Sequence, residues 1–195
     1  MPIRTEKAPP RSVAVVERTL TRLLAEPQFR RRAKVGSVEK EPLSLSTPHS
    51  VYSVGVDELL RGGLKAAEPT STRFIILQGD RTLGSAETRL EGDRPGAFAN
   101  VAQGPEVDGF VEGLARTEAL DRVAKDDFEL RALRINELHV HALWLKGASG
   151  TDVIVPIEPS PEPFAPGRAL EVDEFLRFVA EAAERRPDSR EPVEG

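Results

Sequence analysis

Apolar residues in this chain recur with two different spacings, and the spacing separates predicted helices from predicted strands. From Ser12, a suitable N-cap, to Pro27, apolar residues return every three or four positions and form one stripe. The same spacing continues in other parts of the chain. It predicts further helices over 57–68, 104–127 and 169–186.

Alternating or short apolar runs predict the strands. They cover 51–56, 73–90 (two strands around a turn at 78–80), 128–135, 138–145 and 151–159, with 91–96 expected to be a loop. Short turns between successive strands favour antiparallel pairing, and regular crossover helices are missing from the pattern. We therefore predict an α+β fold, with a mainly antiparallel sheet packed against helices and a basic helical N-terminal extension before it.

The predicted elements divide the chain into four parts. We expect a basic helical extension over 1–40, a linker over 41–50, one α+β domain over 51–186 and a disordered tail over 187–195. A proline-rich stretch, 160–167, contains one large apolar residue, Phe164. We expect this stretch to fold back on the body as a strap, with a ligand for a partner as the alternative.

Charge is unevenly distributed along the chain. Residues 1–40 carry ten Lys or Arg and four Glu, a net charge of +6, whereas the remaining residues carry −11. The densest cluster is Arg30, Arg31, Arg32 and Lys34, which we predict to bind a partner through an acidic surface. An isolated helix of this length is marginal in water, so the preceding apolar stripe must be covered by the body, a second copy or a partner.

Nucleic acid is not the expected partner of this cluster. The sequence pI is about 5.4, and a dedicated nucleic-acid binder is expected to have a basic body. Only Phe29 supplies an aromatic residue beside the arginines. We therefore expect a protein partner or self-association.

One stretch, ELHVHALWL at 137–145, contains residues with metal-binding chemistry. On a strand, Glu137, His139 and His141 would share one face and could offer one oxygen and two nitrogen ligands. The opposite face, Leu138 to Trp144 at alternate positions, is wholly apolar and should be buried. Because the third histidine, His49, falls in the expected linker, we prefer two half-exposed histidines beside a core strand over a metal site.

Other sequence features bear on compartment and reaction class. The chain has no cysteine, no apolar run of roughly 18 residues and no signal-peptide pattern, so we expect a cytoplasmic protein without disulfides or membrane spans. Arginine outnumbers lysine 21 to 6, which is typical of a GC-rich bacterial genome. No phosphate-binding glycine loop or nucleophile elbow occurs.

These observations favour a non-enzymatic interaction or accessory protein that needs no cofactor. In this hypothesis the basic N-terminal arm docks on an acidic protein surface. The alternative is a small-molecule-binding protein or a metal-dependent enzyme that uses the Glu-x-His-x-His strand.

Overall fold

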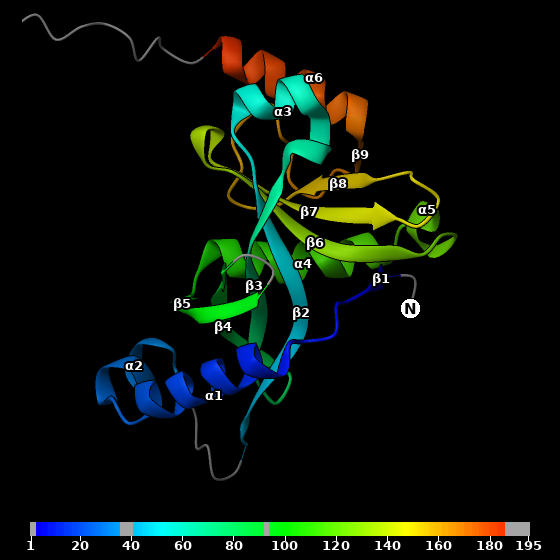
Figure 1. The fold of residues 1–195 in the computed structure, drawn as a ribbon. Coiled ribbons are helices and arrows are strands. Elements are labelled where there is room, and N and C mark those ends of the chain that lie inside the picture. The colour runs from blue at the N-terminus through cyan, green and yellow to red at the C-terminus, as the bar shows by residue number, and fades with distance from the viewer. Residues whose placement is uncertain (1–2, 36–40, 92–93, 186–195) are drawn as a thin grey trace, which may run out of the picture.

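A computed structural model describes residues 3–35, 41–91 and 94–185 of the chain (Figure 1). The α-helices are α1 Pro10–Leu24, α2 Pro27–Arg32, α3 Val56–Gly62, α4 Pro105–Glu118, α5 Asp121–Ala124 and α6 Val172–Glu184. Two 3-10 helices are η1 Gly63–Ala66 and η2 Asn136–Leu138. The strands are β1 Ile3–Arg4, β2 Leu43–Ser53, β3 Glu68–Gln78, β4 Arg81–Glu91, β5 Arg94–Ala102, β6 Phe128–Ile135, β7 Val140–Gly147, β8 Val153–Pro156 and β9 Leu170–Glu171.

All of these strands belong to one sheet. Its order is β5-β4-β3-β2-β6-β7-β8-β9, and β1 pairs with β6 off this path. Neighbouring strands are antiparallel except β2 with β6 and β1 with β6, which are parallel. The predicted α+β fold with a mainly antiparallel sheet is confirmed.

The alternation of side chains along β6 and β7 assigns helices to the two faces of the sheet. Leu130 of β6 and Leu143 of β7 belong to the core that includes α4 residues such as Phe110. Leu133, three positions after Leu130, and Trp144, one position after Leu143, belong to the core with α3 and α6. Side chains of one strand point to opposite faces in turn, so α4 covers one face and the pair α3 and α6 covers the other (Figure 1).

Helix α1 lies against the far end of the sheet. Val16 and Leu20 are buried with Phe74, Ile76 and Leu83 from β3 and β4. The predicted helix is confirmed, and its apolar stripe is covered by the body of the same chain. In β3, Phe74 and Ile76 point away from α4, so α1 shares the face of α3 and α6 at the other end of the sheet.

The start of α1 corrects one detail of the sequence reading. The helix begins at Pro10 with Pro9 at the N-cap, because proline suits the first helical turn. Ser12 lies inside the helix and is buried, and its hydroxyl accepts a hydrogen bond from Thr88 Oγ1 at 2.9 Å. The serine is therefore a polar contact to β4 and not the helix cap.

Two stretches expected to be irregular are strands. Residues 43–50 of the expected linker form the first part of β2, and Leu43 and Leu45 pack at the α1 core. Within the expected loop, β5 begins at Arg94 and pairs with β4 at the edge of the sheet. The expected tail, 187–195, lies outside the described residues.

The proline-rich strap is confirmed. Phe164 is 1% exposed, and its ring lies 5.7 Å from that of Phe175 and 6.3 Å from that of Phe178 in α6. The aromatic contacts bring residues 160–167 back to the α3–α6 core. In the part of the chain that the structure describes, no helix is long and apolar enough to cross a membrane.

Candidate functional site

The Glu-x-His-x-His stretch does not form one strand face. Glu137 lies in η2, and His139 has a left-handed backbone with φ of 52°, so β7 begins only at Val140. Glu137 Oε2 accepts a hydrogen bond from the Val56 backbone N–H at 2.6 Å, at the start of α3. An acidic side chain at this position satisfies an N–H group that the helix leaves unpaired.

His141 alone of the three belongs to a larger polar cluster. It lies on the α4 face of β7, where its Nδ1 is 3.4 Å from Glu106 Oε1. Within residues 3–35, 41–91 and 94–185, no group of three or more Asp, Glu or His side chains could hold a metal ion. The structure therefore does not bring Glu137, His139 and His141 together as one ligand set.

The cluster around His141 is a network of charges between α4 and the sheet. Arg73 Nε donates to Glu87 Oε1 at 2.8 Å, and its Nη2 donates to Glu106 Oε1 at 2.6 Å. Arg134 donates to Glu87 Oε1 at 2.7 Å and to Glu106 Oε1 at 3.1 Å. Arg73 and Glu87 are almost wholly buried, so the network ties the first turn of α4 to β3, β4 and β6.

Both carboxylates of this network stay ionised over a wide pH range. Burial alone would raise the pKa of Glu87, but Arg73 and Arg134 outweigh it and the pKa lies below its ordinary value. The contact with His141, then the charges of Arg73 and Arg134, hold the pKa of Glu106 far below its ordinary value. Every charged group in the cluster has an opposite partner, so we interpret the network as a structural one.

His49 is buried next to this network and was not expected there. Its ring stacks on Phe110 of α4 at 4.5 Å, and its Nδ1 lies 2.7 Å from the Thr47 carbonyl oxygen. Burial, together with the charge of Arg73, lowers its pKa to about 3, so the ring is neutral at physiological pH. Its Nε2 has no hydrogen-bond partner among the described residues.

The predicted basic cluster lies on α2 and immediately after it. Arg30, Arg31, Arg32 and Lys34 are all exposed, and none forms an ion pair with a described residue. Two shallow hollows of about 490 and 510 Å³ lie beside Lys34. We call these four residues the basic surface.

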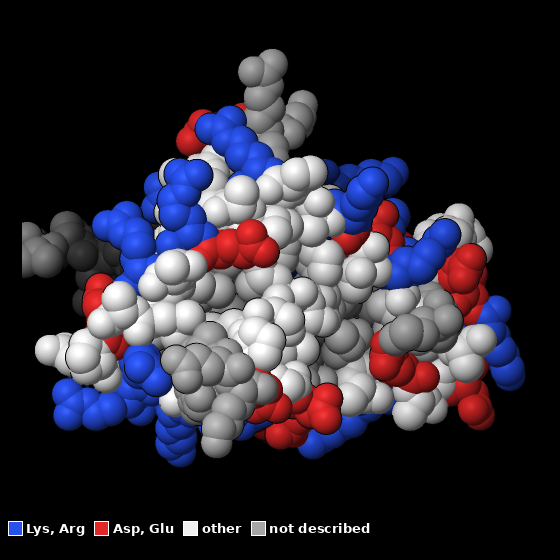
Figure 2. Space-filling model, turned by 90° about the horizontal axis from the view of Figure 1, so that it is seen from below, with Lys and Arg blue, Asp and Glu red and all other residues white. Residues whose placement is uncertain are grey.

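The face that carries α1 and α2 is not uniformly basic. Figure 2 shows Lys and Arg side chains at its edges, several of them on the left, where α2 lies in Figure 1. Acidic side chains are interspersed, and the centre is largely uncharged. The basic surface is therefore a local feature and not part of a continuous cationic face.

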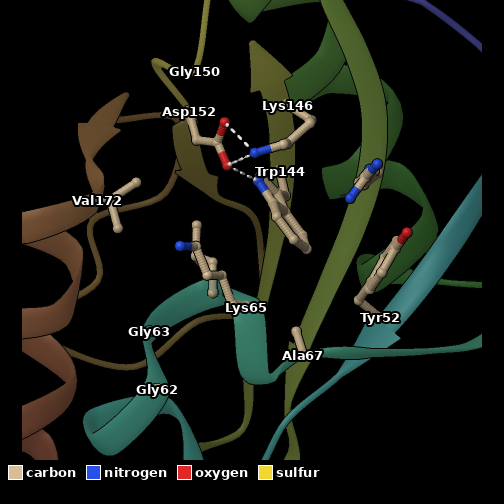
Figure 3. Close-up of a pocket in the computed structure, with 12 residues that line it drawn as sticks. Tyr52, Gly62, Gly63, Lys65, Ala67, Trp144, Lys146, Gly150, Asp152 and Val172 are labelled. Carbon is tan, nitrogen blue, oxygen red and sulfur yellow. Dashed lines mark hydrogen bonds and ion pairs between the residues drawn. The ribbon is translucent and has the colours of Figure 1, made fainter. Parts of the chain in front are cut away.

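A groove of about 570 Å³ opens on the opposite face of the sheet from α4 (Figure 3). Its floor includes Trp144 of β7 and Arg131 of β6, which are directly paired in the sheet. The Arg131 guanidinium lies 4.9 Å from the Trp144 ring and 4.8 Å from the ring of Tyr52. The two rings also contact each other edge to face, with centroids 5.0 Å apart, so the guanidinium lies against a pair of packed aromatic rings.

Asp152 organises one side of this groove. It accepts hydrogen bonds from Trp144 Nε1 at 2.9 Å, from Lys146 Nζ at 3.2 Å and from the Gly147 N–H at 3.2 Å. Its side chain is 7% exposed. Lys65 of η1 points into the groove from the other side, as Figure 3 shows.

Local sequence patterns could not have identified the groove. Its residues come from β2, the end of α3, η1, the segment after η1, β6, β7, the turn before β8 and the first residue of α6. The sequence indicated only that a cation, Arg131, and a large aromatic residue, Trp144, lie within predicted strands. No family model, curated protein or solved structure matches the chain.

Proposed function

We propose that the protein is a non-enzymatic interaction protein whose basic surface docks on an acidic segment of another protein. One observation carries this proposal: Arg30, Arg31, Arg32 and Lys34 are exposed together, with no ion pair to any described residue. Arginine binds carboxylates in bidentate geometry, so four adjacent cations suit an acidic run.

The body of the molecule holds the basic surface in place. After α2, the Val35 N–H donates to the Arg30 carbonyl oxygen at 2.9 Å and closes the end of the helix. Arg81 Nη2, from β4, donates to the Lys34 carbonyl oxygen at 2.6 Å. A surface held in this way loses less conformational entropy on binding than a free arm would.

The charge of the rest of the chain favours a protein partner over nucleic acid. Residues 41–195 carry a net charge of −11, which opposes the approach of a continuous phosphate backbone. An acidic protein segment needs contact only with the basic surface. Its association would still be weakened by salt, because the charges involved are exposed.

The test is affinity capture from the native host, with the full chain as bait. The variant is Arg30→Ala, Arg31→Ala and Arg32→Ala combined, and a matched control combines Arg116→Ala, Arg122→Ala and Arg177→Ala at exposed positions elsewhere. A protein with an acidic surface should be captured by the wild type and the control and lost with the variant. With the purified partner, we expect the variant to bind at least about tenfold more weakly.

Two outcomes would overturn the proposal. One is equal affinity of the purified partner for the triple variant and the control. The other is retention of nucleic acid, and not of protein, by the basic surface. Deletion of residues 1–40 is unsuitable as a test, because Val16 and Leu20 are buried in the core and their loss would disturb the fold.

Binding of a small molecule is a second candidate function, and the groove around Trp144 favours it. The groove and the basic surface share no residue, so the two functions can be tested separately.

A further inference from the structure

We propose that the groove binds a small organic anion with an apolar body. Lys65 and Lys146 would hold the anionic group, and Leu64, Ala67 and Val172 would contact the apolar part. The observations behind this site are independent of the basic surface.

The groove has an excess of positive charge. Its lining contains three cations, Lys65, Arg131 and Lys146, and one carboxylate, Asp152. Lys146 is paired with Asp152, whereas Lys65 forms no ion pair within the described part of the chain. A cationic hollow with low-dielectric walls attracts anions more strongly than an exposed lysine on a convex surface does.

Arg131 contributes shape more than free charge. Its Nε donates to Glu129 Oε1 at 2.6 Å, outside the groove lining, and its guanidinium lies against the rings of both Tyr52 and Trp144. The arginine therefore forms part of a rigid floor. Lys65, which forms no ion pair with a described residue, is left as the group that can turn toward a ligand.

The polar side of the groove is organised before any ligand arrives. Asp152 is buried and holds both the Trp144 indole and the Lys146 amine. Figure 3 shows the Lys65 side chain across the groove from Asp152, between Val172 and Trp144. Groups fixed in advance do not have to be ordered by the ligand, which favours binding of even a small molecule.

The size and the apolar lining define the class of ligand. About 570 Å³ falls within the usual range for small-molecule sites. Among the lining residues, Leu64 is buried, and Ala67 and Val172 are half-buried. An inorganic anion would leave these apolar atoms without contacts, whereas a carboxylate on a hydrocarbon or ring would cover them.

The structure supplies its own reporter for the test, because Trp144 is the only tryptophan in the chain. We would titrate the purified protein with phenylacetate and hexanoate, and follow tryptophan fluorescence. Parallel titrations would use 2-phenylethanol, which lacks the charge, and inorganic phosphate, which lacks the apolar body. We expect a saturable response to at least one carboxylate below about 10 mM, and weaker responses to the other two probes.

Lys65 is the position to vary because its side chain is exposed and its loss should not disturb the core. Lys65→Ala should weaken carboxylate binding at least about tenfold, and Lys65→Arg should restore most of it. Lys125→Ala, at an exposed lysine on the other side of the sheet beside α5, is the matched control and should bind like the wild type.

Four results would contradict the inference. The first is no saturable response to either carboxylate, and the second is equal affinity of Lys65→Ala and Lys125→Ala. The third is binding of 2-phenylethanol as tight as that of phenylacetate, which would exclude the lysines as the binding groups. The fourth is binding of phosphate as tight as that of both carboxylates, which would exclude the apolar wall. None of these results depends on a protein partner, so they leave the proposed function of the basic surface unaffected.

Discussion

Glu87 shows how one residue can join two elements that are distant in sequence. Its Oε1 accepts hydrogen bonds from Arg73 and Arg134, and its Oε2 accepts from Ser71 at 2.9 Å and Arg134 at 3.1 Å. The carboxylate is almost fully buried, so its charge is compensated only by these neighbours. Removing it would leave Arg73 buried beside another cation.

We therefore expect Glu87→Gln to lower the free energy of unfolding by about 3 kcal/mol, because breaking a buried ion pair leaves an uncompensated charge. Urea denaturation followed by circular dichroism measures this change. Glu112→Gln, in an exposed pair with Arg116, should cost less than about 0.5 kcal/mol. Equal costs for the two variants would show that the buried network contributes no more than a surface ion pair.

His49 predicts a pH dependence of stability. Its pKa is about 3 in the fold, below the ordinary value of 6.5 that applies to the unfolded chain. As the pH falls below 6.5, the unfolded chain binds a proton that the native protein does not, so stability falls with acid. The window from 6.5 to 4.5 separates this effect from those of Glu87 and Glu106, because these carboxylates, with lowered pKa values, lose their contributions only below about 4.5.

Between pH 7 and pH 5, we expect the wild type to lose about 2 kcal/mol of unfolding free energy through His49. In His49→Phe the ring can still stack on Phe110 but cannot bind a proton, so the loss should be smaller by about that amount. Urea denaturation at both pH values gives the two differences directly. The comparison uses each protein's own change with pH, so a constant loss of stability in the variant does not affect it. Identical pH dependence in both proteins would contradict a neutral buried His49.

At the scale of elements, local patterns predicted the helices better than the ends of the strands. The stripe of α1 was evident from its spacing, but its partners Phe74 and Ile76 lie far away in sequence, and no local signal indicates them. The apolar alternation through Leu138 continued across η2, where the chain turns between β6 and β7. The break expected at residues 136–137 is present, but the turn extends to His139, so Leu138 and His139 were wrongly assigned to the strand.

The missed strands have a common physical cause. In β2, polar residues such as His49 and Ser50 are buried through contacts with residues distant in sequence. The local sequence shows only their polarity, which predicts a linker. The edge strand β5 begins within a glycine- and proline-rich stretch that resembles a loop. The basic surface could be predicted because it is a local run, whereas the groove depends on the pairing of Arg131 with Trp144.

At the scale of the whole molecule, one sheet carries three apolar cores. The α4 core lies on one face, and the α1 core and the α3–α6 core lie at the two ends of the other. Strands β2 and β3 contribute residues to more than one of these cores. In addition, β1 reaches from the N-terminus to pair with β6. We therefore expect the described part of the chain to unfold as a single cooperative unit.

Leu20→Ala tests this cooperativity, because Leu20 is buried in the α1 core and Trp144 reports on the α3–α6 core. The substitution should cost about 2–5 kcal/mol, and Glu17→Ala, on the exposed side of α1, should cost less than about 0.5 kcal/mol. In urea, the midpoints from Trp144 fluorescence and from far-ultraviolet circular dichroism should coincide and move together by about 1 M or more. A Trp144 midpoint that stays in place while circular dichroism shows an earlier partial transition would contradict this. Residues 1–40 would then behave as the separate extension that the charge pattern predicts, attached to a body that folds without them.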